Sequence, residues 1–404
     1  MATKTKQKKW ILPRHKVVVA LLRPFFSLYT RLSYGVKPEK VNDDRAYLVL
    51  LNHQTAFDQF FVSLSFPKPV YYIASEDLFS NGWISSAIRY LVAPIPIKKQ
   101  TTDIAAVMTC IRVAREGGTI AIAPEGNRTY SGKLVYMSDS IAPLAKKLKL
   151  PIALYRIEGG YGVQPRWSDG LRRGKLRAYV SQVIEPEEYQ QMSNEELFDK
   201  IREGLNVDEA VADHIYRSRK QAEYLERAMY VCPFCGLAEF ESRGNDITCK
   251  TCGRVITHNA DKTLSGQGFT FPFRFVHDWY AHQEKFVNSL DVTAMTEEAL
   301  YQDTVRLSEV IVCKKKNLLR KAAKISLYGN RMVIDEGTDK EETWMFDDIN
   351  VVTVLGRNKL NVYYGKQLLQ FKGSKRFNAL KYVHIFYRYK NIVRGNPDAE
   401  FLGL

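Results

Sequence analysis

Between Arg45 and Ile184, short apolar segments alternate with amphipathic ones, and this alternation restricts the possible folds more than any other feature of the chain. The apolar segments favour strands over residues 46–51, 69–74, 119–123, 151–157 and 175–184. Helices are predicted over residues 102–118, 140–150 and 193–205. Strands and helices that alternate with short connections build an α/β domain, in which helices cover a mostly parallel sheet. We therefore expect an α/β fold over residues 41–205.

The first 40 residues are basic and rich in apolar side chains. They hold ten lysines and arginines but one acid, Glu39, and so contribute most of the net charge of +15. Their longest apolar run, Val17–Leu22, is far shorter than the about 20 residues that cross a bilayer, and no small-residue cleavage site of a signal peptide follows it. Apolar and aromatic residues with a basic flank are typical of a segment in the membrane interface. We expect residues 1–40 to associate with a membrane; the alternative is a basic tail before an ordinary packed helix.

A histidine and an aspartate interrupt the apolar pattern in the stretch VLLNHQTAFDQFF, residues 49–61. His53 and Asp58 lie five positions apart, so on one straight helix they would point in different directions, because each residue turns a helix by about 100°. They can meet if His53 lies in the loop after the strand and Asp58 in the first turn of the next helix. The carboxylate would then fix the imidazole tautomer, and the histidine could act as a general base. The alternative is a surface or core histidine beside a helix cap.

Two further stretches place polar residues at the ends of strand-like segments. In TIAIAPEGNRT, a predicted strand is followed at once by Glu125, Gly126, Asn127 and Arg128. The carboxyl ends of strands are where open α/β sheets bind ligands, and the planar guanidinium of Arg128 suits a phosphate or a carboxylate. The alternative is a Glu–Arg pair in a turn. In PIPIKK, Lys98 could add a second phosphate contact or be an ordinary solvated lysine.

The order of four blocks, NHQTAFD, PIPIKK, PEGNRT and LPIALY, resembles that of the PlsC-like glycerolipid acyltransferases over about residues 40–205. The resemblance implies transfer of a fatty acyl group from acyl-CoA or acyl carrier protein to a hydroxyl of a lysophospholipid. The expected acceptor is 1-acylglycerol-3-phosphate, and the product is phosphatidic acid. It also implies that His53 is the base and that Asp58 orients it. A thioester is already activated, so no catalytic metal is expected.

The same resemblance assigns the other polar residues to the acceptor. The residues that match Glu125, Gly126 and Arg128 bind its phosphate-bearing part, with Asn127 in the same block and Lys98 as the basic residue of the second block. Two positions depart from the family pattern: Asn127 stands where threonine is usual, and a lysine stands where arginine is usual. Lysine still contacts phosphate, but as a point charge rather than a fork.

Cys232, Cys235, Cys249 and Cys252 form two Cys-x-x-Cys pairs thirteen residues apart. Such spacing resembles that of a zinc ribbon, with knuckle-like turns around each pair. Four thiolates complete a tetrahedral shell, so we expect a structural zinc ion within residues 231–256. The alternative is a pair of disulfides, which would need an oxidising compartment.

The rest of the chain divides less clearly. Residues 206–230 are predicted as a charged helical linker, and residues 257–309 as an aromatic and then helical connector. Residues 310–395 contain successive strand patterns with turns at Gly329, Gly356 and Gly365, followed by a helical pattern. Strands closed by one C-terminal helix resemble the pleckstrin-homology and GRAM-like domains, which implies a small β-barrel with a regulatory, scaffolding or lipid-binding role.

Taken together, these features predict an acyltransferase that works at the cytoplasmic face of a membrane, as a peripheral or monotopic protein. Its partners would be membrane lipid and an acyl thioester, which includes acyl carrier protein as a possible donor. One alternative is a catalytically silent acyltransferase-like protein that binds or tethers lipid. Nucleic-acid binding through the ribbon and the basic N-terminus is not expected, because it leaves the four blocks unexplained.

Overall fold

The computed structural model describes residues 9–80, 82–97, 103–134, 136–311 and 314–404. The chain forms two compact units. The first comprises Met1–Arg128, Met137–Gly160 and Lys175–Val207, and the second comprises Thr129–Tyr136, Tyr161–Gly174 and Asp208–Leu404. Two short segments from the middle of the N-terminal half therefore belong to the second unit.

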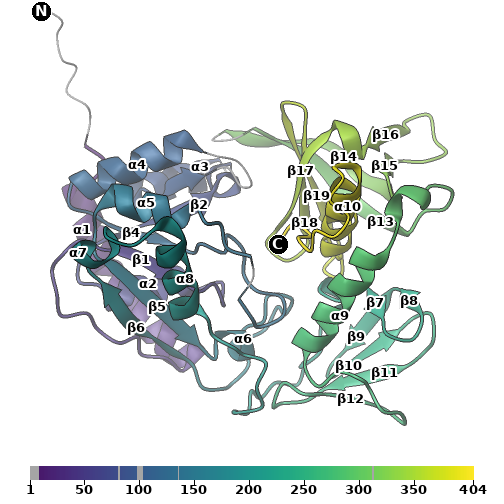
Figure 1. Ribbon diagram of the computed structural model, residues 1–404, viewed down its shortest axis with the longest axis horizontal. Helices are drawn as coiled ribbons and strands as arrows, with labels where there is room; N and C mark the ends of the chain where they lie inside the picture. Colours follow the sequence, from purple (N-terminus) through teal and green to yellow (C-terminus); the bar gives the residue numbers. More distant parts are fainter. Residues whose placement is uncertain (1–8, 81, 98–102, 135, 312–313) are drawn as a thin grey trace, which may run out of the picture. The chain divides into compact units, whose positions relative to one another are not determined.

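The first unit is built on a six-stranded sheet with the order β3-β2-β4-β1-β5-β6 (Figure 1). Its strands are β1 (Leu48–Leu51), β2 (Val70–Ser75), β3 (Ile95–Ile97), β4 (Thr119–Ile122), β5 (Ile152–Glu158) and β6 (Arg177–Ile184). Neighbouring strands are parallel except β5 and β6, which are antiparallel. The central strands β1 and β4 are buried along their full length, as strands covered on both faces are. The predicted α/β fold with a mostly parallel sheet is confirmed.

Helices cover both faces of this sheet. They are α1 (Pro13–Tyr29), α2 (Asp58–Ser65), α3 (Trp83–Val92), α4 (Ile104–Arg115), α5 (Ile141–Leu148), α6 (Gly160–Val163), α7 (Pro186–Tyr189) and α8 (Asn194–Leu205). On one face, buried side chains of β1, β4 and β5 share a core with α4, α5 and α8. On the other face, the α2 residue Ser65 forms a hydrogen bond of 2.8 Å with the buried Tyr155 hydroxyl of β5. Caps define two helix starts: Asp103 accepts from the Ala106 N–H, and Ser193 opens a capping box.

The N-terminal helix α1 continues into a π-helical turn, Thr30–Tyr34. Its Arg23 guanidinium donates to the carbonyl oxygens of Ser63 and Pro67, each at 3.2 Å, and so satisfies acceptors at the end of α2. One basic residue of this segment therefore serves the fold of the first unit. In the part of the chain that the structure describes, no helix has the length and apolarity needed to cross a membrane.

The second unit begins with a small antiparallel region that contains the four cysteines. A hairpin, β7 (Val231–Cys232) with β8 (Gly236–Leu237), precedes a sheet of order β12-β11-β10-β9. The strands of that sheet are β9 (Phe240–Arg243), β10 (Asp246–Cys249), β11 (Val255–His258) and β12 (Leu264–Gly266). Helix α9 (Val276–Ser289) follows and packs its buried Trp279 against this region, where the indole N–H donates to the Val231 carbonyl at 2.8 Å.

A larger antiparallel sheet of order β16-β15-β14-β13-β19-β18-β17 completes the second unit, with α10 (Leu380–Val393) after its last strand. The strands are β13 (Tyr301–Ile311), β14 (Lys315–Leu327), β15 (Arg331–Ile334), β16 (Glu342–Met345), β17 (Ile349–Leu355), β18 (Lys359–Tyr364) and β19 (Gln367–Gly373). The strands after β13 and the final helix lie within the predicted residues 310–395, in a curled antiparallel sheet. The relation to pleckstrin-homology domains stays a prediction.

The predicted helix over residues 206–230 is wrong. Between Asn206 and Tyr224 the chain is irregular, and only a 3₁₀ turn, Leu225–Arg227, follows. Tyr216 explains this course, because its buried ring lies against Gly162 and Gly174, where added Cβ atoms would come within 2.4 Å and 2.1 Å of ring carbons. These tertiary contacts outweigh the helix propensity of the charged residues around it.

The prediction of an aromatic and then helical connector over residues 257–309 holds for the helix, which is α9, but misses β12 and most of β13. Strand β13 is central to the large sheet, where it pairs with both β14 and β19. Its burial follows a period of two from Tyr301 to Leu307 and changes phase after the register shift that follows Leu307, so that Val310 is the next buried residue. The period of two that identifies a strand in a sequence is therefore short here.

Candidate functional site

The candidate site begins where β1 ends. Asn52, the first residue after this strand, is buried, and its amide Nδ2 donates to the Ile157 carbonyl at 2.9 Å. Its Oδ1 accepts from the Ile157 N–H at 2.8 Å. This paired contact ties the loop after β1 to the neighbouring strand β5, so the loop starts from a fixed point at the carboxyl edge of the sheet.

Asp58, the first residue of α2, gathers that loop around its carboxylate. Oδ2 accepts from His53 Nδ1 at 2.8 Å and from the Gln54 N–H at 2.8 Å. Oδ1 accepts from the Thr55 N–H at 2.9 Å and from the Thr55 hydroxyl at 2.6 Å. The Asp58 side chain is 1% exposed, whereas the His53 side chain is 26% exposed. The carboxylate is therefore a buried anchor, and the imidazole lies between it and the solvent.

This geometry fixes the chemistry of the imidazole. An ionised carboxylate only accepts hydrogen bonds, so His53 Nδ1 must carry the hydrogen in the contact with Asp58. In the neutral ring the lone pair then belongs to Nε2. A histidine held in this tautomer by a buried carboxylate can take a proton from a substrate and return it later, with the carboxylate stabilising the imidazolium.

The loop after β4 braces the loop after β1. Glu125 Oε1 accepts from the backbone N–H of His53 at 2.8 Å, and Arg128 Nε donates to the carbonyl oxygen of Gln54 at 3.2 Å. Gly126 makes the turn possible, since its φ of +65° lies in the region that favours glycine. Because β1 and β4 are parallel neighbours, their following loops meet at one edge of the sheet.

The structure therefore brings together His53, Asp58, Glu125 and Arg128 by direct hydrogen bonds. Asn127 is buried in the same turn as Gly126. Lys98, predicted as a second phosphate contact, lies outside the described residues.

Sequence reasoning missed the supporting roles of Asn52 and Thr55. The signal for Thr55 is its place three residues before an aspartate at a helix start, which allows its hydroxyl and N–H to reach the carboxylate. Asn52 carries no such local signal, because its partner Ile157 is 105 positions away in the sequence.

Comparison with known proteins identifies the region around this site. Residues 35–157 match the family model described as acyltransferase. The chain carries an acyltransferase domain. The resemblance drawn from the four blocks is confirmed, and the matched residues include His53, Asp58, Glu125 and Arg128.

Several relatives resemble this domain. The 1-acyl-sn-glycerol-3-phosphate acyltransferase of Bacillus subtilis (strain 168) is 22% identical over 176 residues, which cover 43% of this chain and 85% of that protein. A chloroplastic 1-acyl-sn-glycerol-3-phosphate acyltransferase of Brassica napus is 22% identical over 41% of this chain and 48% of its own length. Among solved structures, the 1-acyl-sn-glycerophosphate acyltransferase PlsC of Thermotoga maritima is 23% identical, with a TM-score of 0.40 over 47% of this chain and 78% of that one.

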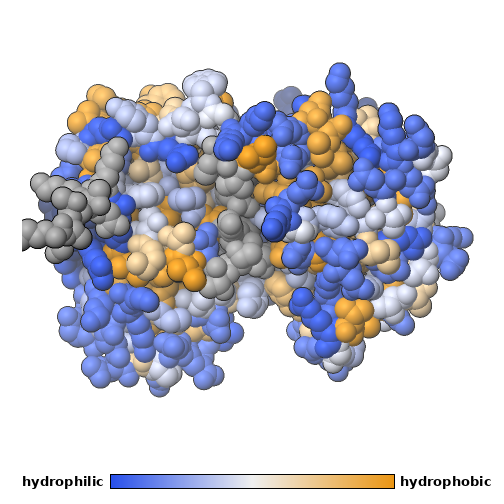
Figure 2. Space-filling view, turned by 90° about the horizontal axis from the view of Figure 1, so that it is seen from above, coloured by the Kyte–Doolittle hydropathy of each residue, from blue (hydrophilic) through white to orange (hydrophobic). Residues whose placement is uncertain are grey.

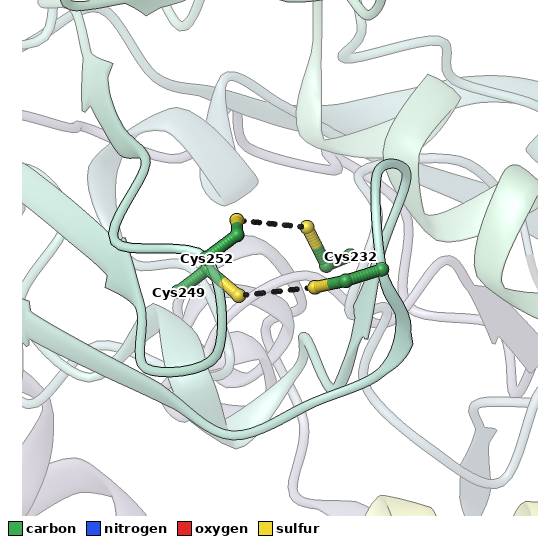
Figure 3. A group of neighbouring side chains, drawn as sticks. Cys232, Cys249 and Cys252 are labelled. Carbon is green, nitrogen blue, oxygen red and sulfur yellow. Dashed lines mark hydrogen bonds between the residues drawn. The ribbon is translucent and has the colours of Figure 1, made fainter.

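The four cysteines form a second candidate site, separate in sequence from the acyltransferase domain. Their sulfur atoms lie within 4.8 Å of one another. Figure 3 shows Cys232, Cys249 and Cys252 turned toward a common centre. The Sγ atoms of Cys232 and Cys252 are 3.9 Å apart, and those of Cys235 and Cys249 are 3.6 Å apart.

These distances decide between the two interpretations of the cysteines. A disulfide holds its sulfur atoms at about 2.05 Å. Four thiolates around one ion at about 2.3 Å from each sulfur lie about 3.8 Å apart in tetrahedral geometry. The measured separations match the second arrangement, so the cluster fits a structural metal ion. Gly236 and Gly253, with φ of +78° and +70°, turn the chain after each pair.

Proposed function

We propose that the protein transfers a fatty acyl group from acyl-CoA or acyl carrier protein to the hydroxyl of 1-acylglycerol-3-phosphate, giving phosphatidic acid. The observation that carries the proposal is the hydrogen bond of 2.8 Å between His53 Nδ1 and Asp58 Oδ2 at the carboxyl end of β1. Arg128, hydrogen-bonded to the same loop, adds a cation suited to the acceptor phosphate. The names of the three curated relatives, each a 1-acyl-sn-glycerol-3-phosphate acyltransferase, support this acceptor.

In this reaction His53 Nε2 takes the proton of the acceptor hydroxyl while the hydroxyl oxygen attacks the carbonyl carbon of the thioester. The new C–O bond produces a tetrahedral oxyanion, and its collapse breaks the C–S bond. The leaving thiolate takes the proton from His53, which restores the neutral imidazole. Between the two proton transfers the buried Asp58 carboxylate stabilises the imidazolium.

Arg128 and Glu125 have different proposed roles in binding. Arg128 would hold the acceptor phosphate, and its hydrogen bond to the Gln54 carbonyl keeps it beside the catalytic loop. Glu125 acts as a positioning residue, because its carboxylate already accepts from the His53 backbone N–H. Gly126 and Asn127 shape the turn that carries both.

A membrane location follows from the surface of the first unit, and we propose that it is peripheral or monotopic, on the cytoplasmic face. Val17, Leu21, Phe25, Leu28 and Leu32 recur every three or four residues, and each is more than half exposed. This spacing puts them on one face of the N-terminal helical segment. Helix α3 adds exposed apolar residues, among them one tryptophan that is 80% exposed. Figure 2 shows apolar side chains on the surface of this unit.

Such a surface is costly in water and suits the interface of a bilayer, where the lysophospholipid acceptor resides. Replacing Leu21 and Phe25 by glutamine should weaken binding to phospholipid vesicles while the fold is retained. The measurement is co-flotation with vesicles, and His53→Ala serves as the control, since His53 is not one of the exposed apolar residues of this surface. Equal flotation of all three proteins would contradict the proposed surface.

The deciding experiment is an acyl-transfer assay with acyl-CoA and acyl carrier protein as donors and a panel of acceptors. We expect turnover with 1-acylglycerol-3-phosphate, and a kcat about 10²–10⁴-fold lower in the His53→Ala variant, which should remain folded. Arg128→Gln should raise the KM for 1-acylglycerol-3-phosphate but not for 1-acylglycerol, which lacks the phosphate. Wild-type activity in His53→Ala would refute the catalytic role, and vesicle binding without turnover on any acceptor would favour the catalytically silent alternative.

We also propose that the ion at the four cysteines is zinc, in a structural role. Four cysteine sulfurs in tetrahedral spacing favour zinc or iron, and two Cys-x-x-Cys turns are typical of zinc ribbons. With four protein ligands, the ion would have no open position for a substrate.

A further inference from the structure

The hairpin of β13 and β14 extends beyond its neighbours in the large sheet. Strand β19 pairs with β13 from Val305 to Glu309, and β15 pairs with β14 only from Ile325 to Leu327. The outer half of β14, Lys315–Ala323, therefore pairs with β13 alone among the described strands. Because β13 still pairs with β19 from Val305 to Glu309, the outer half of β14 is here the edge strand of the sheet, with one side unpaired among the described strands.

The hairpin carries a large excess of positive charge. Residues 301–327 contain seven lysines and arginines and two acids. Both acids are already engaged: Asp303 accepts from Lys381 at 2.9 Å, and Glu309 accepts from Asn317 at 3.3 Å.

Two of the seven basic residues are also engaged within the fold. Arg320 is paired with Asp335 and Glu342, and Lys316 donates to the Gln370 side chain at 3.1 Å. The other five have no carboxylate partner among the described residues: Arg306, Lys314, Lys315, Lys321 and Lys324. Each of these five residues is exposed.

Two leucines stand among these cations. Leu318 is 40% exposed and Leu319 is 52% exposed. The cause is a bulge, because Leu307 pairs with Arg320 and Ser308 pairs with Leu318, which leaves Leu319 without a partner on β13. A bulge that turns an apolar side chain outward, between lysines, is unfavourable in water unless another surface receives it.

We propose that the β13–β14 hairpin docks the second unit on a bilayer surface rich in anionic phospholipid. The five unpaired cations match a negative surface in charge, and basic residues near such a surface each raise binding. Leu318 and Leu319 would enter the interface between the headgroups, as apolar residues beside basic ones do. The two leucines favour a bilayer over a nucleic acid. This contact lies outside the acyltransferase domain, so the proposal does not depend on the acyl acceptor.

Three variants of the full chain test the proposal. The first replaces Lys314, Lys315 and Lys321 by glutamine, and the second replaces Leu318 and Leu319 by serine. The control replaces three exposed lysines elsewhere in the same unit by glutamine, namely Lys340, Lys366 and Lys375. It removes the same charge without changing the hairpin. Binding is measured by co-flotation with vesicles of phosphatidylcholine alone or of phosphatidylcholine with phosphatidylglycerol, at low and at high salt.

Since each basic residue contributes about a fivefold increase in partitioning, the lysine variant should bind anionic vesicles on the order of 100-fold more weakly at low salt. Its binding to neutral vesicles, and its turnover of detergent-dispersed acceptor, should be unchanged. The leucine variant should weaken binding at both salt concentrations, and the control should bind like the wild type.

The proposal is overturned if the lysine variant binds anionic vesicles like the wild type, or if the control loses as much. Loss of binding to single-stranded RNA with unchanged vesicle binding would also overturn it, in favour of a nucleic-acid contact. Failure of the acyl-transfer assay would leave these vesicle results unaffected, so the two proposals can fail separately.

Discussion

Replacing Asp58 by asparagine should damage both the fold and the chemistry of the acyltransferase domain, whereas replacing His53 by alanine should damage the chemistry alone. The difference follows from the contacts of the two side chains. The Asp58 carboxylate accepts from four donors: the imidazole Nδ1, two backbone N–H groups and one hydroxyl. His53→Ala removes only one of these four contacts, and the His53 side chain is 26% exposed.

The magnitudes can be worked from these contacts. Asparagine keeps one acceptor oxygen, which can serve two donors, so two buried donors lose their partner. Each buried unsatisfied donor costs about 1–3 kcal/mol, and the lost negative charge at the start of α2 costs a further ~0.5 kcal/mol. Asp58→Asn should therefore lower the free energy of unfolding by roughly 2–6 kcal/mol. His53→Ala leaves three donors on Asp58 and should cost about 1 kcal/mol.

Thermal unfolding followed by circular dichroism, together with the acyl-transfer assay, measures both effects. For a unit of this size each kcal/mol lowers Tm by about 2–4 °C, so Asp58→Asn should lose on the order of 10 °C. Both variants should lose about 10²–10⁴-fold in kcat, the usual contribution of a general base. Asp139→Asn, an exposed aspartate of the same unit, is the control and should change neither quantity.

Either of two results would refute this reasoning directly. If Asp58→Asn unfolds at the wild-type temperature, the carboxylate does not bear the four contacts described. If His53→Ala instead loses as much stability as Asp58→Asn, His53 has a structural role, and its proposed role as the general base is refuted.

Three further predictions concern the second unit. Cys249→Ser should reduce bound zinc, measured by elemental analysis, from about one ion per chain to none. The control is Cys110→Ser, which changes a buried cysteine of the first unit and should keep the zinc. Zinc retained in Cys249→Ser would contradict the proposed centre. Burial, with a smaller contribution from Glu400, raises the pKa of Glu284 to about 7. The native state therefore holds a proton that the unfolded state releases, so the free energy of unfolding falls as pH rises from about 4.5 to 7. Glu284→Gln should raise Tm at pH 8 but not at pH 5. Burial lowers the pKa of His384 to about 3. As pH falls below about 6.5 the unfolded state takes up a proton before the native state does, which lowers the free energy of unfolding by about 2 kcal/mol at pH 5. His384→Gln should therefore lose less Tm between pH 7 and pH 5 than the wild type.

The contact of His53 with Asp58 was predictable from the sequence because the contacts of this loop are local. His53, Gln54 and Thr55 all reach Asp58 from within five positions of it. A strand end followed by a helix start leaves this loop few conformations. The brace from Glu125 was not predictable in the same way, since it acts across 72 positions. It depends on β4 lying beside β1, and the order of strands in a sheet does not follow from their order in the chain.

The wrong elements share a physical cause, which is tertiary packing that outweighs a local pattern. Residues 206–230 have the composition of a charged helix, yet the ring of Tyr216 fits between two glycines that belong to another part of the chain. Strand β13 alternates in burial only from Tyr301 to Leu307, and its bulges then bring Val310 to the buried side. Neither the glycine contacts nor the bulges can be read from a window of one strand or one helix.

The two parts of the candidate site differ in how they would respond to change elsewhere in the chain. The contact of His53 with Asp58 rests on residues 52–58, on Ile157 and on the start of α2, all within the first unit. Arg128 is the last residue of that unit before the chain enters the second one at Thr129. A change in the second unit should therefore alter the placement of Arg128, and with it the KM for a phosphate-bearing acceptor, before it alters the base and kcat. Zinc removal offers this test: a chelated protein that keeps its kcat on 1-acylglycerol but loses affinity for 1-acylglycerol-3-phosphate fits the argument, and an equal loss of kcat on both acceptors contradicts it.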